Sequence, residues 1–279
     1  MVETINDINK LIPGTVLSNN DVTRIFKCSD QGGMRRSHKT NSLVLISTVD
    51  RSLYHNHWID KSTIHYTGMG QEGDQDLMWS QNKTLLQSTT NGVNVYLLES
   101  SKPRQYTYQG KVELFQNPFQ EIQKDSKGRE RKVWVFPLRL VDNQVQPPID
   151  VEIINEIFER EEEAARKLSS PELERKASEF ESHKPGIRSA TSTYYERNAY
   201  VSEYAKRRAD GKCQLCYDEA PFTTKKGEPY LETHHIIFLS KGGTDTRDNV
   251  VALCPNCHRK MHSLNEKEDV KTLKTRIGA

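Results

Sequence analysis

Short apolar runs separated by turn residues fill the first half of the chain. Val, Leu, Ile and aromatic residues dominate four of these runs, so we expect β-strands at residues 42–46, 93–98, 108–115 and 132–138. Residues 125–128, Asp-Ser-Lys-Gly, predict a turn between the last two runs. Strands at such intervals, with little helix between them, indicate a curled sheet or a small barrel.

The pattern becomes helical after residue 150. Apolar residues recur at helical spacing at Val151, Ile154, Ile157, Phe158 and Ala164. Ser170 and Pro171 predict a second helix, with serine at its cap and proline just inside. The polar residues 183–193 read as a linker, and a further helix is expected over 194–208.

These patterns predict an α+β protein in three parts. A β-rich domain is expected at residues 1–148, a helical linker at 149–193 and a third domain at 194–279. A chain of 279 residues is long enough for two domains that each have a core.

The composition indicates the cellular compartment of the protein and the kind of partner it binds. No apolar run approaches the ~20 residues of a membrane span, and the N-terminus lacks an apolar signal core, so we expect a cytoplasmic protein without a membrane partner. Few cysteines outside C-x-x-C pairs indicate a reducing compartment. Basic residues are in slight excess at both ends and flank an acidic segment at 150–182, which weakly favours nucleic acid. The chain has no phosphate-binding glycine loop, so no nucleotide cofactor is expected.

Two C-x-x-C pairs predict a zinc site near the C-terminus. The pairs are Cys213/Cys216 and Cys254/Cys257. Four thiolates from two such knuckles make a closed tetrahedral Zn²⁺ site with no open position for a substrate. We therefore expect this zinc to be structural.

A second cluster in the same stretch contains histidine and asparagine without thiolates. Its members are His234, His235, Asn249, His258 and His262. His258 and His262 are four residues apart, which places both rings on one face of a helix. Such ligands suit a hydrated divalent cation that stays open for chemistry. The alternative is a plain zinc ribbon that uses all these histidines, but a ribbon has no use for adjacent histidines or for Asn249.

Residues 195–265 resemble the HNH, or ββα-metal, endonuclease fold. The resemblance is strongest to the McrA-like branch that carries a four-cysteine zinc. It rests on the order Cys-x-x-Cys, His-His, Gly-Gly, Asp-Asn, Cys-x-x-Cys-His-x-x-x-His. One departure is Phe238, which stands where many members have proline.

The HNH resemblance implies a role for each member of the histidine cluster. His234, His258 and His262 match the ligands of a catalytic divalent cation, which is Mg²⁺ or another such as Mn²⁺, Ni²⁺ or Co²⁺. His235 matches the general base that takes a proton from the attacking water, and Asn249 matches the residue that orients this base.

Residues 12–141 resemble the SRA (YDG) domain, a member of the PUA-like barrels. The matching segments, in order, are residues 42–45, 65–70, 74–75, 82–88, 108–110 and 133–138. That family binds duplex DNA holding a modified cytosine and flips the base into an aromatic cage. The loop at 47–63 departs from the family, because it is longer and lacks the Gly-Tyr-Glu-Asp-Asp run.

The SRA resemblance implies a pocket for the modified base. Tyr66 would form one stacking wall and Thr67 would lie at the base edge, with Tyr54 as the second wall. Asp50 or Asp60 would accept from the cytosine amino group. The alternative is that both tyrosines are ordinary aromatics of a β domain. Candidate phosphate contacts are Arg35, Arg36 and Lys39, with a solvated loop as the alternative.

Together these features predict a modification-dependent, type IV-like restriction endonuclease. It would bind double-stranded DNA containing 5-methylcytosine or 5-hydroxymethylcytosine by base flipping and hydrolyse phosphodiester bonds. A homodimer is expected, because one HNH site cuts one strand. Two alternatives remain: a non-catalytic modified-DNA-binding protein with a structural zinc module, or an HNH nuclease whose N-terminal domain reads RNA or a plain sequence.

Overall fold

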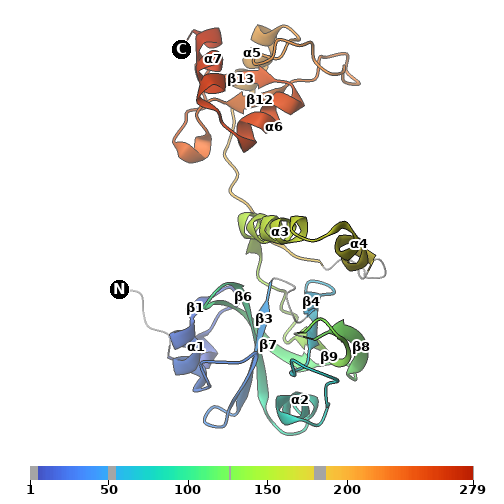
Figure 1. The fold of residues 1–279 in the computed structure, drawn as a ribbon. Helices are drawn as coiled ribbons and strands as arrows, with labels where there is room; N and C mark the ends of the chain where they lie inside the picture. Colours follow the sequence, from blue (N-terminus) through green and yellow to red (C-terminus); the bar gives the residue numbers. More distant parts are fainter. Residues whose placement is uncertain (1–5, 50–54, 126, 179–186, 279) are drawn as a thin grey trace. The chain divides into compact units, whose positions relative to one another are not determined.

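A computed structural model describes residues 6–49, 55–125, 127–178 and 187–278. The chain divides into two compact units, Met1–Ser192 and Thr193–Ala279, which are drawn in Figure 1 and described separately below. Within the described ranges, no helix has both the length and the apolar character that a bilayer crossing requires.

A nine-stranded sheet forms the first unit. Its strands are β1 (Val16–Ser18), β2 (Met34–Ser37), β3 (Ser42–Thr48), β4 (His57–Trp58), β5 (Thr63–Thr67), β6 (Asn94–Lys102), β7 (Gln105–Leu114), β8 (Phe119–Lys124) and β9 (Glu130–Leu140). The spatial order is β2-β3-β6-β7-β9-β5-β4, while β1 pairs with β7 and β8 with β9. The four strands expected from the sequence correspond to β3, β6, β7 and β9, and the α+β class is confirmed.

Helices accompany this sheet more closely than the sequence pattern indicated. They are η1 (Ile8–Lys10), α1 (Asn19–Phe26) and α2 (Ser80–Leu86), followed after the sheet by α3 (Val151–Arg166) and α4 (Ser170–Ser178). A reciprocal capping box starts α1, because Ser18 accepts from the Asp21 amide while the Asp21 carboxylate accepts from the Ser18 amide. The cap predicted at Ser170 lies one residue earlier, where Ser169 donates its hydroxyl to Glu172 at 2.6 Å.

The predicted linker at 183–193 is docked over its described residues. The Ile187 amide donates to the Trp58 carbonyl at 3.1 Å, and Arg188 Nη1 donates to Glu99 Oε2 at 2.7 Å. A short parallel pair follows, between β10 (Ile149–Asp150) and β11 (Ala190–Thr191). Glu99 is only 5% exposed, so this ion pair ties residues 187–192, the exit segment, to a buried carboxylate of the first unit.

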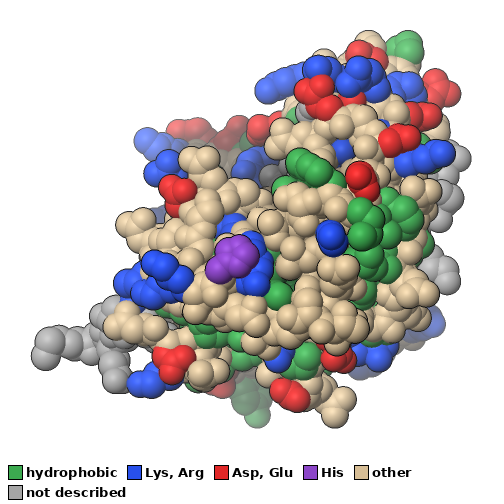
Figure 2. Space-filling view, turned by 90° about the horizontal axis from the view of Figure 1, so that it is seen from below, with side chains coloured by type: hydrophobic (Ala, Val, Ile, Leu, Met, Phe, Trp, Pro, Cys, Tyr) green, Lys and Arg blue, Asp and Glu red, His purple; other side chains and the backbone are tan. Residues whose placement is uncertain are grey.

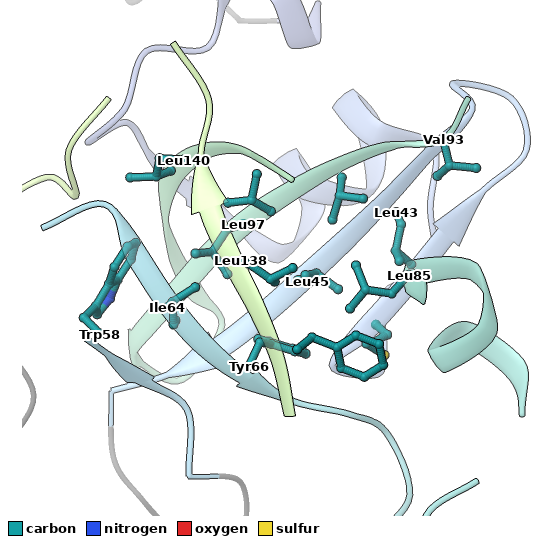
Figure 3. Packing of buried hydrophobic residues seen from close by; sticks show 14 residues of the cluster. Leu43, Leu45, Trp58, Ile64, Tyr66, Leu85, Val93, Leu97, Leu138 and Leu140 are labelled. Carbon is teal, nitrogen blue, oxygen red and sulfur yellow. The ribbon is translucent and has the colours of Figure 1, made fainter. Parts of the chain in front are cut away.

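The main core of the first unit lies between its strands and α2. Leu43, Leu45, Leu97, Leu138 and Leu85 are fully buried there, as Figure 3 shows. Each contributes about 1.5–3 kcal/mol through the apolar area it removes from water. A second buried cluster packs α1 against the other face of the sheet.

The second unit is smaller. Its elements are α5 (Ala199–Ala209), β12 (Glu232–His235), η2 (Leu239–Lys241), β13 (Val250–Leu253), α6 (Pro255–Ser263) and α7 (Lys267–Ile277). β12 and β13 form an antiparallel pair in which His234 lies opposite Val251 and His235 opposite Val250. The helix expected from residue 194 begins at Ala199, because the Asn198 side chain accepts from the Tyr200 amide and caps it.

Candidate active site

The four cysteines of the two C-x-x-C pairs come together at the start of α6. Their sulfur atoms all lie within 4.8 Å of one another. Cys254 is the N-cap of α6 and accepts from the Cys257 amide at 3.5 Å, and Cys213 accepts from the Leu215 amide at 3.4 Å. Backbone donors aimed at the sulfurs stabilise thiolates, so the geometry fits the predicted structural zinc.

Two thiols of this group, those of Cys216 and Cys257, resist losing their protons without a cation. Burial raises the pKa of Cys216 to about 11, and burial together with the neighbouring thiols raises the pKa of Cys257 well above its usual range. Four thiolates packed this closely repel one another, and a divalent cation removes that repulsion. The donor set therefore fits Zn²⁺ chemically as well as geometrically.

The three predicted ligands of the second cation also come together. Ring nitrogens of His234, His258 and His262 lie within 4.8 Å of one another, and the two Nε2 atoms of His258 and His262 are 3.1 Å apart. Phe238 stacks on His262 with ring centroids 5.2 Å apart and meets His234 edge-on. The residue that replaces the usual proline thus forms an apolar wall beside the histidines.

His234 shows that this group is built to receive a ligand. Its side chain is 1% exposed, and neither ring nitrogen has a hydrogen-bond partner among the described residues. Burial, together with the nearby His258 and His262, lowers the pKa of His234 to about 3, so the ring is neutral at cellular pH. A buried neutral imidazole with two unpaired nitrogens is costly unless one of them binds a cation.

Glu232 fixes the direction of His258 and was not recognised from the sequence. Its Oε2 accepts from His258 Nδ1, while its Oε1 accepts from the Tyr230 hydroxyl at 2.9 Å. The hydrogen bond from His258 lowers the pKa of Glu232, which keeps the carboxylate ionised. His258 Nδ1 therefore carries the proton, and Nε2 is the nitrogen that could bind a cation.

His235 lies at the end of β12, outside the three-histidine group. Its Nε2 lies 2.8 Å from Asp245 Oδ1, and the second carboxylate oxygen of Asp245 accepts from the Asn198 amide. Burial opposes ionisation of Asp245, but the hydrogen bonds from Asn198 and His235 lower its pKa below the usual value. An ionised carboxylate only accepts hydrogen bonds, so His235 carries its proton on Nε2 and presents Nδ1 as a base.

Asn249 was expected to orient His235, but its side chain bonds to the backbone of the loop that follows β12. Its Oδ1 accepts from the Ile237 amide at 2.8 Å, and its Nδ2 donates to the carbonyls of Ile237 and Thr244. No described hydrogen bond joins its side chain to the His235 ring. The loop is tight at Gly243, where an added Cβ would lie 1.9 Å from the Ile237 carbonyl oxygen. Asn249 thus sets the path of the segment that brings Asp245 to His235.

The predicted base-pocket residues of the first unit are placed differently from the expectation. Tyr66 is 3% exposed and packs in the main core (Figure 3), where its hydroxyl donates to the Gly33 carbonyl at 2.9 Å. It is therefore not an open stacking wall in this structure. Asp60 accepts from Ser62 and Thr63, which makes it a turn-forming carboxylate. Tyr54 and Asp50 lie outside the described residues.

Thr67 follows Tyr66 on β5 and is also buried. Its amide donates to Asn56 Oδ1 at 2.8 Å, and its hydroxyl accepts from Gln123 Nε2 at 3.2 Å. Adjacent strand residues point to opposite faces, so Thr67 faces away from the core that holds Tyr66. Thr67 and Tyr66 thus serve different faces of one strand.

The candidate phosphate contact Arg35 is a structural residue. It is 4% exposed, and its guanidinium donates to Gly32, Asn19 and Tyr106. The N–H groups of Arg35 donate to internal acceptors and are not available to a phosphate. The expectation of a phosphate contact was therefore wrong for Arg35. Figure 2 shows one face of the molecule, on which Lys and Arg side chains are spread among uncharged and acidic ones.

Comparison with known protein families accounts for both units. The family described as "ScoMcrA-like, SRA domain" matches residues 13–162, and "HNH endonuclease" matches residues 213–264. Fold and site together thus define a DNA-binding SRA domain joined to an HNH endonuclease domain, as the two resemblances indicated. The first match spans more than half of the chain, so the chain belongs to the ScoMcrA-like SRA family.

Several proteins similar to this chain are restriction endonucleases. The type IV methyl-directed restriction enzyme EcoKMcrA of Escherichia coli K12 is 44% identical over 112 residues, which are 40% of this chain and 38% of the relative. The type IV phosphorothioation-dependent restriction endonuclease ScoMcrA is 20% identical, with 96% of this chain and 63% of that chain covered and a TM-score of 0.41. The modification-dependent restriction endonuclease TagI is 19% identical, with coverages of 92% and 79% and a TM-score of 0.37. The chain therefore spans less than two thirds of EcoKMcrA and of ScoMcrA.

Proposed function

We propose that this chain is a type IV-like restriction endonuclease that acts in the cytoplasm on double-stranded DNA containing modified cytosine. The SRA domain, bounded at about residue 148 as the sequence predicts, binds the modified site by base flipping. The linker at 149–193 joins it to the HNH domain at 194–279, which hydrolyses a phosphodiester bond. One observation carries the nuclease half: a buried, unpartnered His234 beside His258 and His262, within the HNH match.

The proposed chemistry uses His235 as general base. Asp245 holds the Nε2 proton of His235, so the lone pair on Nδ1 takes a proton from the attacking water. His234, His258 and His262 would hold a divalent cation such as Mg²⁺ or Mn²⁺, which stabilises negative charge on the leaving oxygen when bound. Asn249 keeps the intervening loop in place, and the four-cysteine Zn²⁺ holds the start of α6.

Arg197 adds a positive charge beside this site. It lies close enough to His234 and His262 for its charge to lower the pKa of both rings. A guanidinium next to a cation site suits a phosphate oxygen of the bound strand. One such site cuts one strand, so a double-strand break would require a homodimer or two successive nicks.

Nicking of matched supercoiled plasmids tests this function. The plasmids carry cytosine, 5-methylcytosine, 5-hydroxymethylcytosine or its glucosylated form, and each is incubated with and without Mg²⁺ or Mn²⁺. We expect cleavage of at least one modified plasmid only when a divalent cation is present, and none by His235→Ala. Failure to nick any plasmid would favour a non-catalytic binding protein. Equal nicking of all four plasmids would support the nuclease activity and show that modified cytosine does not direct it.

A further inference from the structure

The sheet face opposite the main core contains a buried arginine that has no acidic partner among the described residues. Arg131 on β9 is 2% exposed, and its Nε and Nη2 atoms have no hydrogen-bond partner among the described residues. Within the described part of the chain, Nη1 alone has a partner, the Gly70 carbonyl at 2.5 Å. Nε and Nη2 lie along one edge of the guanidinium plane, so the unpaired atoms form a ready two-donor edge.

A buried acceptor lies directly across from this arginine. Gln123 on β8 is the cross-strand partner of Arg131 and is 4% exposed, and its Oε1 also lacks a partner in the described part of the chain. Its Nε2 donates to Thr67 Oγ1 at 3.2 Å and to Glu121 Oε2 at 3.3 Å. Because a carboxylate only accepts, Glu121 fixes the orientation of the amide and leaves Oε1 as the free atom.

Unpaired buried groups of this kind are expensive. A buried guanidinium without a counter-charge, or a buried carbonyl without a donor, costs stability that a folded protein normally avoids. Three such atoms on neighbouring strands indicate a position prepared for a ligand that supplies two acceptors and one donor.

Resting on the proposed function, we infer that Gln123 and Arg131 read the pairing edge of the extruded cytosine. One acceptor from Gln123 and two donors from Arg131 are the same set that guanine offers to cytosine in a base pair. Cytosine returns one donor, its N4 amino group, and two acceptors, N3 and O2. Thymine offers an acceptor in place of that amino group, which would face Gln123 Oε1. The pair therefore separates 5-methylcytosine from thymine, which carries the same methyl group.

The surroundings favour a base over a phosphate. A phosphate would suit Arg131 alone, but Gln123 Oε1 and the Glu121 carboxylate repel an anion at the same place. Rings also lie on this face, where Phe119 and His65 meet edge-on with centroids 5.2 Å apart. Phe119 lies four residues before Gln123 on β8, so the same face offers both rings and polar groups to a flat, neutral ligand.

Binding of the full chain to two duplexes tests the inference. Both duplexes present guanine opposite the target, which is 5-methylcytosine in one and thymine in the other, and no divalent cation is added. We expect wild type to prefer 5-methylcytosine, although the mismatched thymine is easier to extrude. Arg131→Met and Gln123→Leu should each reduce that preference by about 5- to 150-fold, the range for one good base contact.

Lys132→Met is the matched control for charge. Lys132 adjoins Arg131 on the exposed side of β9, so its loss should weaken both duplexes alike. Thermal unfolding supplies the second readout, because removing an unpaired buried guanidinium should raise the Tm of Arg131→Met by roughly 2–4 °C.

Three results would overturn the inference, and each has a different meaning. An unchanged preference in both variants would remove the edge-reading role alone. A Tm that falls in Arg131→Met, with both duplexes weakened in proportion, would show a structural arginine. Equal binding of wild type to 5-methylcytosine, thymine and unmodified duplexes would overturn the reader half of the proposed function together with the inference.

Discussion

The two units of this chain are stabilised by different means. The first has a main core of fourteen buried residues and a second cluster around α1. Among the described residues, the second has one cluster of six, which includes Cys213 of the metal group, and another of three. A small core rarely stabilises a domain without a disulfide or a metal. The comparison teaches that apolar packing supports the first unit, whereas the second unit combines a smaller apolar core with two groups of side chains that could each hold a cation.

Removing one thiolate should break this contrast most strongly. Structural zinc contributes on the order of 10–16 kcal/mol to small zinc domains, so Cys254→Ser should unfold the second unit while the first stays folded. Calorimetry with zinc analysis would show loss of one transition and of the metal. Cys28→Ser is the control, since Cys28 lies outside the four-cysteine group. A variant that keeps both its zinc and its nuclease transition would refute the assignment.

Changing Asp245 should separate chemistry from folding within the nuclease unit. Asp245→Asn removes the acceptor that sets the His235 tautomer, so we expect single-turnover cleavage to fall by about 10²–10⁴-fold, as in other carboxylate–histidine pairs. DNA affinity and zinc content should stay unchanged. Asp248→Asn, three residues away and exposed, is the matched control. Asp245→Glu should restore part of the rate, and wild-type rates in Asp245→Asn would exclude a role for this contact.

The smallest expected effect concerns Tyr66, which tests how apolar packing stabilises the first unit. Tyr66→Phe removes a hydroxyl that donates to the Gly33 carbonyl, so the first unit should lose about 0.5–1.5 kcal/mol of unfolding free energy. Tyr200→Phe is the control, because Tyr200 is 87% exposed. Urea unfolding of the first unit measures the difference. A silent Tyr66→Phe would indicate a ring that acts by stacking alone.

The sequence patterns predicted the features that depend on residues close together in the chain. The four apolar runs became β3, β6, β7 and β9, and the C-x-x-C and histidine spacings brought the metal groups together. The Ser18–Asp21 spacing also fits a capping box, which is a sequence signal for the start of α1. Alternation along β5 also places Tyr66 on the same side as the buried Ile64, which already indicated a core position.

Contacts made through loop geometry could not be predicted in this way. Asp245 and Asp248 stand in the same loop, and nothing in the sequence tells which carboxylate reaches His235. Glu232 meets His258 only because β12 and α6 pack together. The unpaired atoms of Gln123 and Arg131 likewise become visible only when strand register and burial are known.

The ion pair between Arg188 and Glu99 also limits the length of free chain between the two units. Because it anchors the exit segment, the first unit extends to Ser192, and only residues 193–198 precede the first turn of α5. Six residues span at most about 20 Å when fully extended. That length corresponds to roughly six steps along one DNA strand. Under the proposed function, so short a tether would limit how far the cut can lie from the modified base, and mapped cleavage positions should fall in a narrow window around each modified site.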